Sequence, residues 1–517
     1  MSRSLFVVVG LFAGSSYAGG VEDYDVVISR DEDEGGVSVK RARPFSDYFF
    51  GDVGGYYSVG EVERTFVGVE GGFELPFADD GGLFVLAFEA KRSSIELEQR
   101  RKLFTSEANL RAMCGARADN DEERALCADG AQDRVLQRLG FPAERSLKVI
   151  SIDTDIAEAF VHYAPTDGVL VHVGRRQHVW GQFDLFSPVS ILLPLRYGNN
   201  AVDFKKKNFL VPQDSASLAW FITPNVELQG HFFINTEIDS LLSDVIEEFG
   251  GERDVEDHRQ YAMRLLYRPS WGTVGLTLYK GRLSAFYYEN ARLMADGGID
   301  DEQIDLAPLS AYALELAVPV GSWVWKAEVV YQKTREDITP LISPMGNSDV
   351  DRATRAYVAY VRERNGGSFT SEVDRVLVGL GADARVQGWV VNLGLYMLKA
   401  FYDDKGDTLR RLERGAGRDN SDDFIIFPGV NVARRFGRDE RYTTGLVGGL
   451  IGPILGVSLY GTMRIGDNLT LYGSGEFVST LADTFIDEAN QNEGAGVSYS
   501  FSNDLGVGAR FGVRYAF

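Results

Sequence analysis

The carboxyl-terminal segment from Leu505 to Phe517 constrains the fold more than any other part of the chain. Its apolar side chains fall on every second position: Leu505, Val507, Ala509, Phe511, Val513, Tyr515 and Phe517. This period of two is the pattern of a β-strand with one apolar and one polar face. Because about 9–11 alternating residues suffice to cross a lipid bilayer, the segment predicts a membrane-spanning strand.

The amino terminus predicts export. Met1–Ala18 contains one basic residue, Arg3, followed by an apolar run and then the small residues Ser16 and Ala18. A charged start, a short apolar stretch and a small-residue exit are the marks of a signal peptide, here residues 1–18. The apolar run is too short to cross a membrane as a helix. We therefore expect the mature chain to begin near Gly19, outside the inner membrane.

Composition excludes several classes of protein. The net charge is −22 over 517 residues, which argues against a nucleic-acid partner. After the first 18 residues no stretch of about 18 apolar residues predicts a spanning helix. The acidic residues gather in polar segments that we interpret as solvated loops, with a cation-gathering vestibule as the alternative.

Alternating stretches recur from about residue 46 to the end, separated by short turns and long polar loops in turn. Tight turns are expected at Pro224-Asn225, Pro269-Ser270, Val320-Gly321 and Gly466-Asp467. Long loops alternating with tight turns are typical of outer-membrane barrels, with the loops outside and the turns in the periplasm. Residues 46–517 are therefore predicted to form an all-β, transmembrane antiparallel barrel of about 16 strands, within a range of about 14–18.

Face assignments within single stretches support this interpretation. Trp323, Trp325, Val329 and Tyr331 share one face, and Lys326, Glu328 and Gln332 share the other. In the same way Tyr261, Met263, Leu265 and Tyr267 alternate with Gln260 and Arg264. Aromatic residues near the ends of such stretches fit the girdles found at membrane interfaces.

The strand count contains an inconsistency. With both chain ends in the periplasm, the predicted stretches would place the long loops between 92 and 441 on the wrong side. We therefore expect an unassigned strand near Asp47–Ser58 and a wrong assignment between Tyr442 and Asn503, with 494–501 as the suspect stretch.

Two segments differ from the rest of the chain. Residues 19–45 are acidic and predict a flexible arm or a short plug. Residues 93–140 are rich in helix formers and predict a helical loop insertion, which contains Cys114 and Cys127. In an oxidising compartment these two cysteines are expected to form a disulfide.

The densest group of polar and aromatic residues lies between Val171 and Asp203. It is a strand that continues into a loop, and a basic side chain facing lipid there would cost about 2–4 kcal/mol at the membrane midplane. One of the two arginines should therefore lie at an interface, or a bulge at Gly174 should turn both inward. A structural role, tying the loop to the wall, is the alternative to a pore function. The residues expected at a pore constriction are Arg175, Arg176, Asp184 and Arg264.

The same segment resembles a proteobacterial outer-membrane barrel family of unknown function. The resemblance rests on Gly174, Arg175, Arg176, Gln177, Trp180, Gly181, Asp184 and Pro188. The terminal strand resembles the closing strand of Gram-negative outer-membrane barrels, which implies that Tyr515 and Phe517 form an assembly signal. These resemblances imply an outer-membrane location, lipid and lipopolysaccharide around the barrel, contact with the barrel-assembly machinery and a possible homotrimer.

Catalytic and metal-binding motifs are not evident. His162 is expected opposite Val171 or His172 across a hairpin, but a metal site would need further ligands. No nucleophile motif of the G-x-S-x-G type occurs, and we predict neither an enzyme nor a cofactor.

The sequence therefore favours a porin or channel for passive or substrate-selective diffusion of small hydrophilic solutes. The alternative is a non-conducting or gated barrel that acts as a scaffold or as the outer-membrane part of an export system.

Overall fold

The computed structural model describes much of the chain beyond residue 48. The described residues are 49–59, 62–77, 81–103, 144–166, 168–183, 187–194, 210–234, 259–288, 292–293, 299–300, 304–337, 361, 370–404, 406–409, 424–437, 441–451, 454–465, 469–480, 497–500 and 506–516. The predicted signal peptide, the acidic segment 19–45, both cysteines, Asp184 and Phe517 lie outside them. Among the described residues, no helix is long and apolar enough to cross a membrane.

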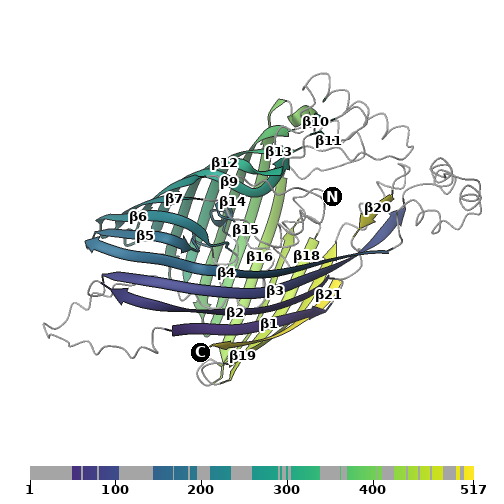
Figure 1. Ribbon diagram of the computed structural model, residues 1–517, viewed down its shortest axis with the longest axis horizontal. Coiled ribbons are helices and arrows are strands. Elements are labelled where there is room, and N and C mark those ends of the chain that lie inside the picture. The colour runs from purple at the N-terminus through teal and green to yellow at the C-terminus, as the bar shows by residue number, and fades with distance from the viewer. Residues whose placement is uncertain are drawn as a thin grey trace, which may run out of the picture.

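Long antiparallel strands dominate the described residues (Figure 1). The first half contains β1 (Phe49–Val59), β2 (Val62–Phe77), β3 (Gly82–Leu103), β4 (Glu144–Thr166), β5 (Val169–Arg176), the 3₁₀ turn η2 (Ser190–Leu192), β6 (Gln213–Thr223), β7 (Val226–Phe233), β8 (Gln260–Tyr267), β9 (Thr273–Tyr288), β10 (Arg292–Leu293) and β11 (Ile299–Asp300). The second half contains β12 (Ile304–Val320), β13 (Trp323–Asp337), β14 (Thr370–Val386), β15 (Trp389–Tyr402), β16 (Phe424–Phe436), β17 (Tyr442–Ile451), β18 (Ile454–Ile465), β19 (Leu469–Thr480), β20 (Val497–Ser500) and β21 (Gly506–Ala516).

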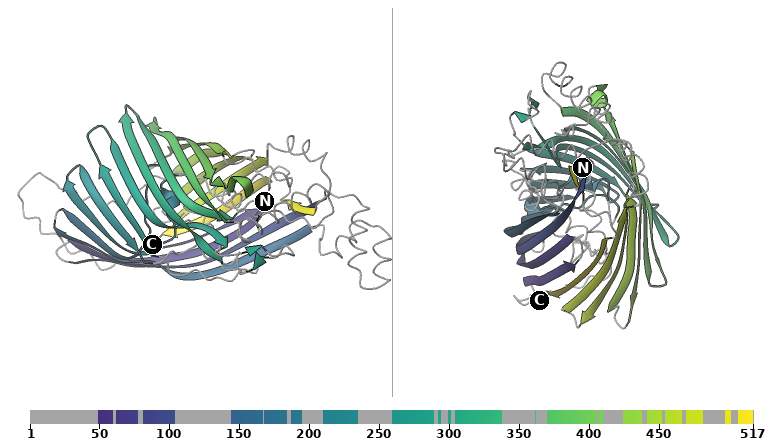
Figure 2. Two further views of the ribbon diagram at one scale, coloured as in Figure 1. Left: turned by 90° about the horizontal axis from the view of Figure 1, so that it is seen from above. Right: turned by 90° about the vertical axis from the view of Figure 1, so that its right-hand side faces the viewer.

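The main sheet closes on itself. Consecutive long strands pair antiparallel along the chain, and β1 pairs with β21 from Asp52↔Ala516 to Val59↔Ala509. This sheet contains 19 strands. One of them, β20, pairs only with Arg100–Leu103 at the end of β3, so the other eighteen strands form the closed ring. The walls of this ring are seen from two further directions in Figure 2. Closure leaves no open edge, which satisfies the backbone hydrogen bonds of every ring strand.

Eight tight connections lie at one end of the barrel, and two further short links, after β1 and after β17, lie at the opposite end. The links after β2, β4, β6, β8, β12, β14, β16 and β18 contain two to five residues. The long links, such as 104–143, 177–212 and 338–369, lie at the opposite end. Because the ring has an even number of strands, β1 begins and β21 ends at the tight-turn end. The predicted rhythm of turns and loops is confirmed.

The observed ring corrects the strand count. Eighteen lies at the upper limit of the expected range, and the missing strand near 47–58 is β1. The second missing strand is β16, which lies inside a segment predicted to be loop. Between Tyr442 and Asn503, β17, β18 and β19 follow the predicted stretches, so none of these assignments is wrong. The suspect stretch 494–501 contains the short strand β20, which lies outside the ring. The helical loop insertion was expected to begin at residue 93. Strand β3 extends to Leu103, so residues 93–103 belong to the wall.

Side chains alternate between the two faces of the wall as predicted. Along β8, Gln260, Ala262, Arg264 and Leu266 are buried, whereas the residues between them are exposed. Along β13, Glu328, Val330 and Gln332 are buried, and Trp325, Val329 and Tyr331 are exposed on the other face. The buried face is the barrel interior, and the exposed face is largely apolar.

Candidate functional site

Two described segments of the long link between β5 and β6, residues 177–183 and 187–194, lie in the barrel interior. We call these two segments the inner loop. Trp180, Phe183, Val189, Leu192 and Leu193 are almost fully buried within it. A loop this apolar gains free energy by leaving water and packing against the inner wall.

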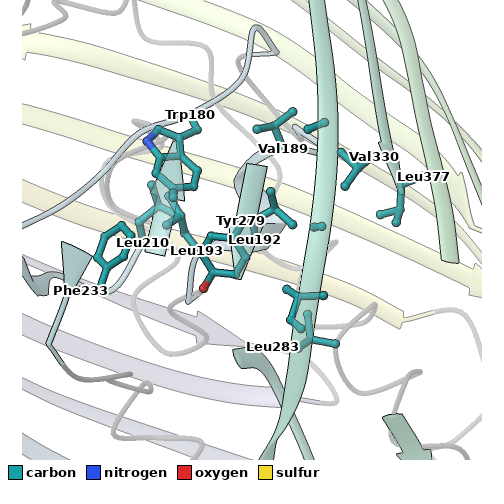
Figure 3. Packing of buried hydrophobic residues seen from close by; sticks show 14 of the residues in the cluster. Trp180, Val189, Leu192, Leu193, Leu210, Phe233, Tyr279, Leu283, Val330 and Leu377 are labelled. Carbon is teal, nitrogen blue, oxygen red and sulfur yellow. The ribbon is translucent and has the colours of Figure 1, made fainter. Parts of the chain in front are cut away.

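An apolar cluster fixes the inner loop to the wall of β7, β8, β9, β12, β13 and β14 (Figure 3). Val189, Leu192 and Leu193 enter the cluster from the loop, and Trp180 lies beside Phe233 and Tyr279. The wall contributes small residues that let the loop approach closely. They are Ala262, Ala307, Ala311 and Ala313. The inner loop is therefore a packed part of the barrel, with its own core.

Glu328 on β13 holds the inner loop by hydrogen bonds. Its carboxylate accepts the backbone N–H groups of Gln182, Phe183 at 3.2 Å and Val189 at 3.1 Å. It also accepts the hydroxyl of Ser187 at 2.7 Å. The Glu328 side chain is 0% exposed, and a buried carboxylate is stable only when donors surround it. These bonds fix the position of the inner loop along the barrel axis and hold its two described segments together.

A second buried carboxylate, Glu315 on β12, lies directly opposite Glu328 in the strand register. It accepts Arg264 Nη2 at 2.9 Å and the Gln182 side-chain amide at 3.3 Å. Arg264 also donates to Thr277 at 3.2 Å, and its guanidinium stands 5.4 Å from the Trp180 ring centroid. Gln182 therefore bridges the two carboxylates, donating to one from its backbone and to the other from its side chain.

Glycines make room for the loop. Gly181 has a φ of +82°, a conformation that L side chains rarely adopt, and a Cβ there would lie 2.7 Å from Glu328 Oε1. On β14, a Cβ at Gly379 would lie 3.0 Å from Pro188 and 3.2 Å from Phe183. The absence of a side chain at Gly379 lets the inner loop lie directly against the backbone of β14.

Histidines and aromatic residues line the inner wall beside the loop. His162 and His172 are direct cross-strand partners, as one of the two predicted registers requires, and their rings meet edge to face at 4.3 Å. Arg176 Nη1 donates to His172 Nδ1 at 2.8 Å. His178 in the loop is hydrogen-bonded to Ser215 at 2.8 Å. Among the described residues, no group of three or more His, Cys, Asp or Glu side chains could hold a metal ion.

The structure separates the residues expected at the constriction. Arg264 contacts the inner loop, and Arg176 faces the interior beside His172 and Phe160. Arg175 takes the other face, where it pairs with Asp214 at 3.7 Å and donates to the Ile156 carbonyl. The pairing of Gly174 and Arg175 with both neighbouring strands is regular, so no bulge at Gly174 turns Arg175 inward.

Two residues central to the site were not among those expected there. Alternation had placed Glu328 on the polar face of its strand but gave it no role. Glu315 is the one charged residue in the largely apolar stretch Ala311–Val320, and such an interruption can indicate an inward, paired charge.

The sequence matches no protein-family model and no curated protein. Solved structures of outer-membrane proteins resemble this chain. The outer membrane protein OpdK from Pseudomonas aeruginosa has 11% identity and a TM-score of 0.41, with 91% of this chain and 98% of that chain covered. A BenF-like porin from Pseudomonas fluorescens has the same values. OmpT, an outer membrane protein of Vibrio cholerae, has 8% identity and a TM-score of 0.37, with 91% and 96% covered. The fold assignment itself rests on the strand pairings of this chain.

Proposed function

We propose that this chain is an outer-membrane channel through which small hydrophilic solutes diffuse, passively or with selectivity for particular substrates. One observation carries the proposal: a closed barrel with an apolar outer face holds a folded loop against one side of its interior. A barrel of eighteen strands is wide enough to enclose an aqueous passage. A loop fixed to one side of the interior narrows such a passage without stopping it.

The outer face supports a membrane location. Exposed aromatic residues form one row near the tight turns: Trp220, Tyr267, Trp271, Trp325, Trp389 and Tyr442. A second row lies toward the long links: Tyr261, Tyr312, Tyr331 and Phe401. From Trp325 to Tyr331 the strand rises about 20 Å, or about 16 Å along the barrel axis at a tilt of about 40°, and from Trp389 to Phe401 it rises about 41 Å, or about 31 Å along the axis. These spacings lie on either side of the apolar band of about 25 Å in outer-membrane barrels.

The positions of the connections support an orientation. Outer-membrane barrels keep short turns in the periplasm and long loops outside. We therefore place the start of β1 and the end of β21 at the periplasmic side. Cleavage of residues 1–18 and reading of Tyr515 and Phe517 by the assembly machinery belong to the same proposal, and so do the Cys114–Cys127 disulfide and a homotrimer.

The interior suggests how solutes are selected. Arg264 is a fixed positive group paired with the buried Glu315, and Glu328 lies opposite Glu315 in the strand register. Arg176 is a further positive group on the interior face, beside His172. Opposed charges at the narrowest part of a pore create a transverse field that orders polar solutes and water. In this scheme the inner loop determines the size of the passage, and the field of these fixed charges favours some solutes over others.

A gated or non-conducting barrel is the second candidate, favoured by one observation. The inner loop is buried against the wall from β9 to β14, with Val189 0% and Leu192 1% exposed. A loop so well anchored fits a closed state as well as a permanent constriction. This candidate would use the barrel as a scaffold or as the outer part of an export system.

Swelling of liposomes tests the proposal. The refolded mature chain is inserted into liposomes, which are diluted into isotonic sugars and amino acids of increasing size. The proposal predicts swelling whose rate falls with solute size, and faster entry of larger solutes through Glu328→Gln, which loosens the loop. Swelling with Glu328→Gln alone would support a gated barrel. Absence of swelling with both proteins would contradict a channel.

A further inference from the structure

The outward face of β9, β12 and β13, together with the residue just before β8, carries a group of basic side chains at the end with the long links. We call it the basic patch, and it consists of Arg259, Lys280, Arg282, Lys333 and Arg335. The acids beside it on the described strands are Glu372 and Asp374 on β14, and Asp337, which ends β13 two residues after Arg335. Five basic groups against three acids is a local excess of positive charge in a chain whose net charge is −22.

The strand register brings two of these lysines to either side of a small residue. Ser310 on β12 is the direct partner of Lys280 on β9 and of Lys333 on β13. Neighbouring strands are about 4.8 Å apart, so the two lysine backbones are separated by about 10 Å. Both side chains are exposed and flexible, and their ammonium groups can reach a common ligand above the Ser310 hydroxyl.

The patch begins where the apolar outer face ends. Tyr312 and Tyr331 are direct partners one outward row nearer the tight turns. Tyr261, whose ring is exposed, is the other direct partner of Lys280. Aromatic side chains of this kind lie at the level of the lipid head groups. The basic groups therefore stand at the height of head-group phosphates.

We infer that the basic patch binds the phosphate groups of anionic lipid in the outer leaflet, that is, a phosphorylated glycolipid of the lipopolysaccharide type. The inference rests on the proposed membrane orientation and adds a partner and its site. Phosphate oxygens accept charge-assisted hydrogen bonds from ammonium and guanidinium groups. Juxtamembrane basic residues attract anionic lipid in the same way.

The two lysines contribute unequally. Lys333 forms an ion pair with Glu372 at 3.1 Å, and its side chain is 56% exposed, so a phosphate must compete with that carboxylate. Lys280 has Tyr261 and Ser310 as its direct strand partners, and both are uncharged. Lys280 is therefore the stronger anchor.

The test compares lipid binding by the full mature chain and by two charge-matched variants in neutral detergent. The probe is lipid A with two phosphates, and the reference is the same lipid with its phosphates removed. The first variant is Lys280→Gln with Lys333→Gln. The control is Lys399→Gln with Arg434→Gln, which removes two outward charges elsewhere on the wall. Bound lipid is counted by native mass spectrometry.

We expect the patch variant to bind diphosphoryl lipid A about tenfold more weakly than the wild-type chain, and the control to bind it within about twofold. The inference would be overturned if the patch variant bound diphosphoryl lipid A as tightly as the wild-type chain does. It would also be overturned if the wild-type chain bound the phosphate-free lipid as tightly as diphosphoryl lipid A. Loss of self-association in the patch variant without any change in lipid binding would assign the face to contacts between copies instead. Solute entry into neutral liposomes is measured on the same proteins, so failure of the lipid site is distinguishable from failure of the channel.

Discussion

At the scale of single residues, Glu328 is the side chain that holds the inner loop. Replacing it by glutamine keeps the shape but turns one acceptor into a donor facing loop donors. We expect Glu328→Gln to lower the free energy of unfolding by about 2–3 kcal/mol. Urea titration of the folded barrel measures this. The control is Glu336→Gln, whose carboxylate pairs with Arg375 in a more accessible place, with an expected loss under about 1 kcal/mol. Equal losses would show that the loop does not depend on Glu328.

The buried pair of Arg264 and Glu315 gives a second prediction at this scale. Removing either partner leaves an uncompensated buried charge, so Arg264→Met and Glu315→Gln should each cost about 3–5 kcal/mol. The double variant should cost much less than the sum of the two. A double-mutant cycle in urea measures the coupling, and additive losses would contradict a direct interaction.

At the scale of elements, the contact between β14 and the inner loop depends on a missing side chain. We expect Gly379→Val to displace Phe183 and Pro188 and to cost about 1–3 kcal/mol through overpacking. Limited proteolysis should then cut within the inner loop. Gly230→Val on β7 is the control, because a Cβ there meets nothing within 4 Å. If both variants resist proteolysis equally, the inner loop does not pack against Gly379.

The strands differ in how well sequence predicted them, for physical reasons. β8 and β13 have a clean alternation and were assigned correctly, faces included. β16 was missed because Pro428 interrupts it, and proline is rare inside sheets. The structure accommodates Pro428 opposite Leu395 on β15, just before pairing with β17 begins at Gly429.

The candidate site could be predicted only in part. Alternation on β8 sufficed to place Arg264 on the inner face, and the density of polar and aromatic residues identified the start of the loop. The partners of the loop could not be found in this way, because Gln182 lies 133 residues from Glu315 and 146 residues from Glu328 in the chain. Only closure of the whole ring brings such distant residues together.

At the scale of the whole molecule, the outer wall should behave as a lipid-facing surface. Leu314 lies between the two aromatic rows and is exposed, so Leu314→Arg should cost about 2–4 kcal/mol in a bilayer. Val386 lies at the tight-turn end, and Val386→Arg should cost about 0–1 kcal/mol. Unfolding in lipid vesicles measures both. A cost independent of position would argue against a membrane-spanning wall.

Conductance tests the central claim most directly. The mature chain is refolded, its folding is verified by heat-modifiable migration, and it is added to a planar lipid bilayer under a salt gradient. The account predicts stable unitary current steps. The steps should be larger in the Glu328→Gln variant, because the inner loop then detaches from the barrel wall. A bilayer that stays silent with both folded proteins would contradict the proposal that this barrel is a channel.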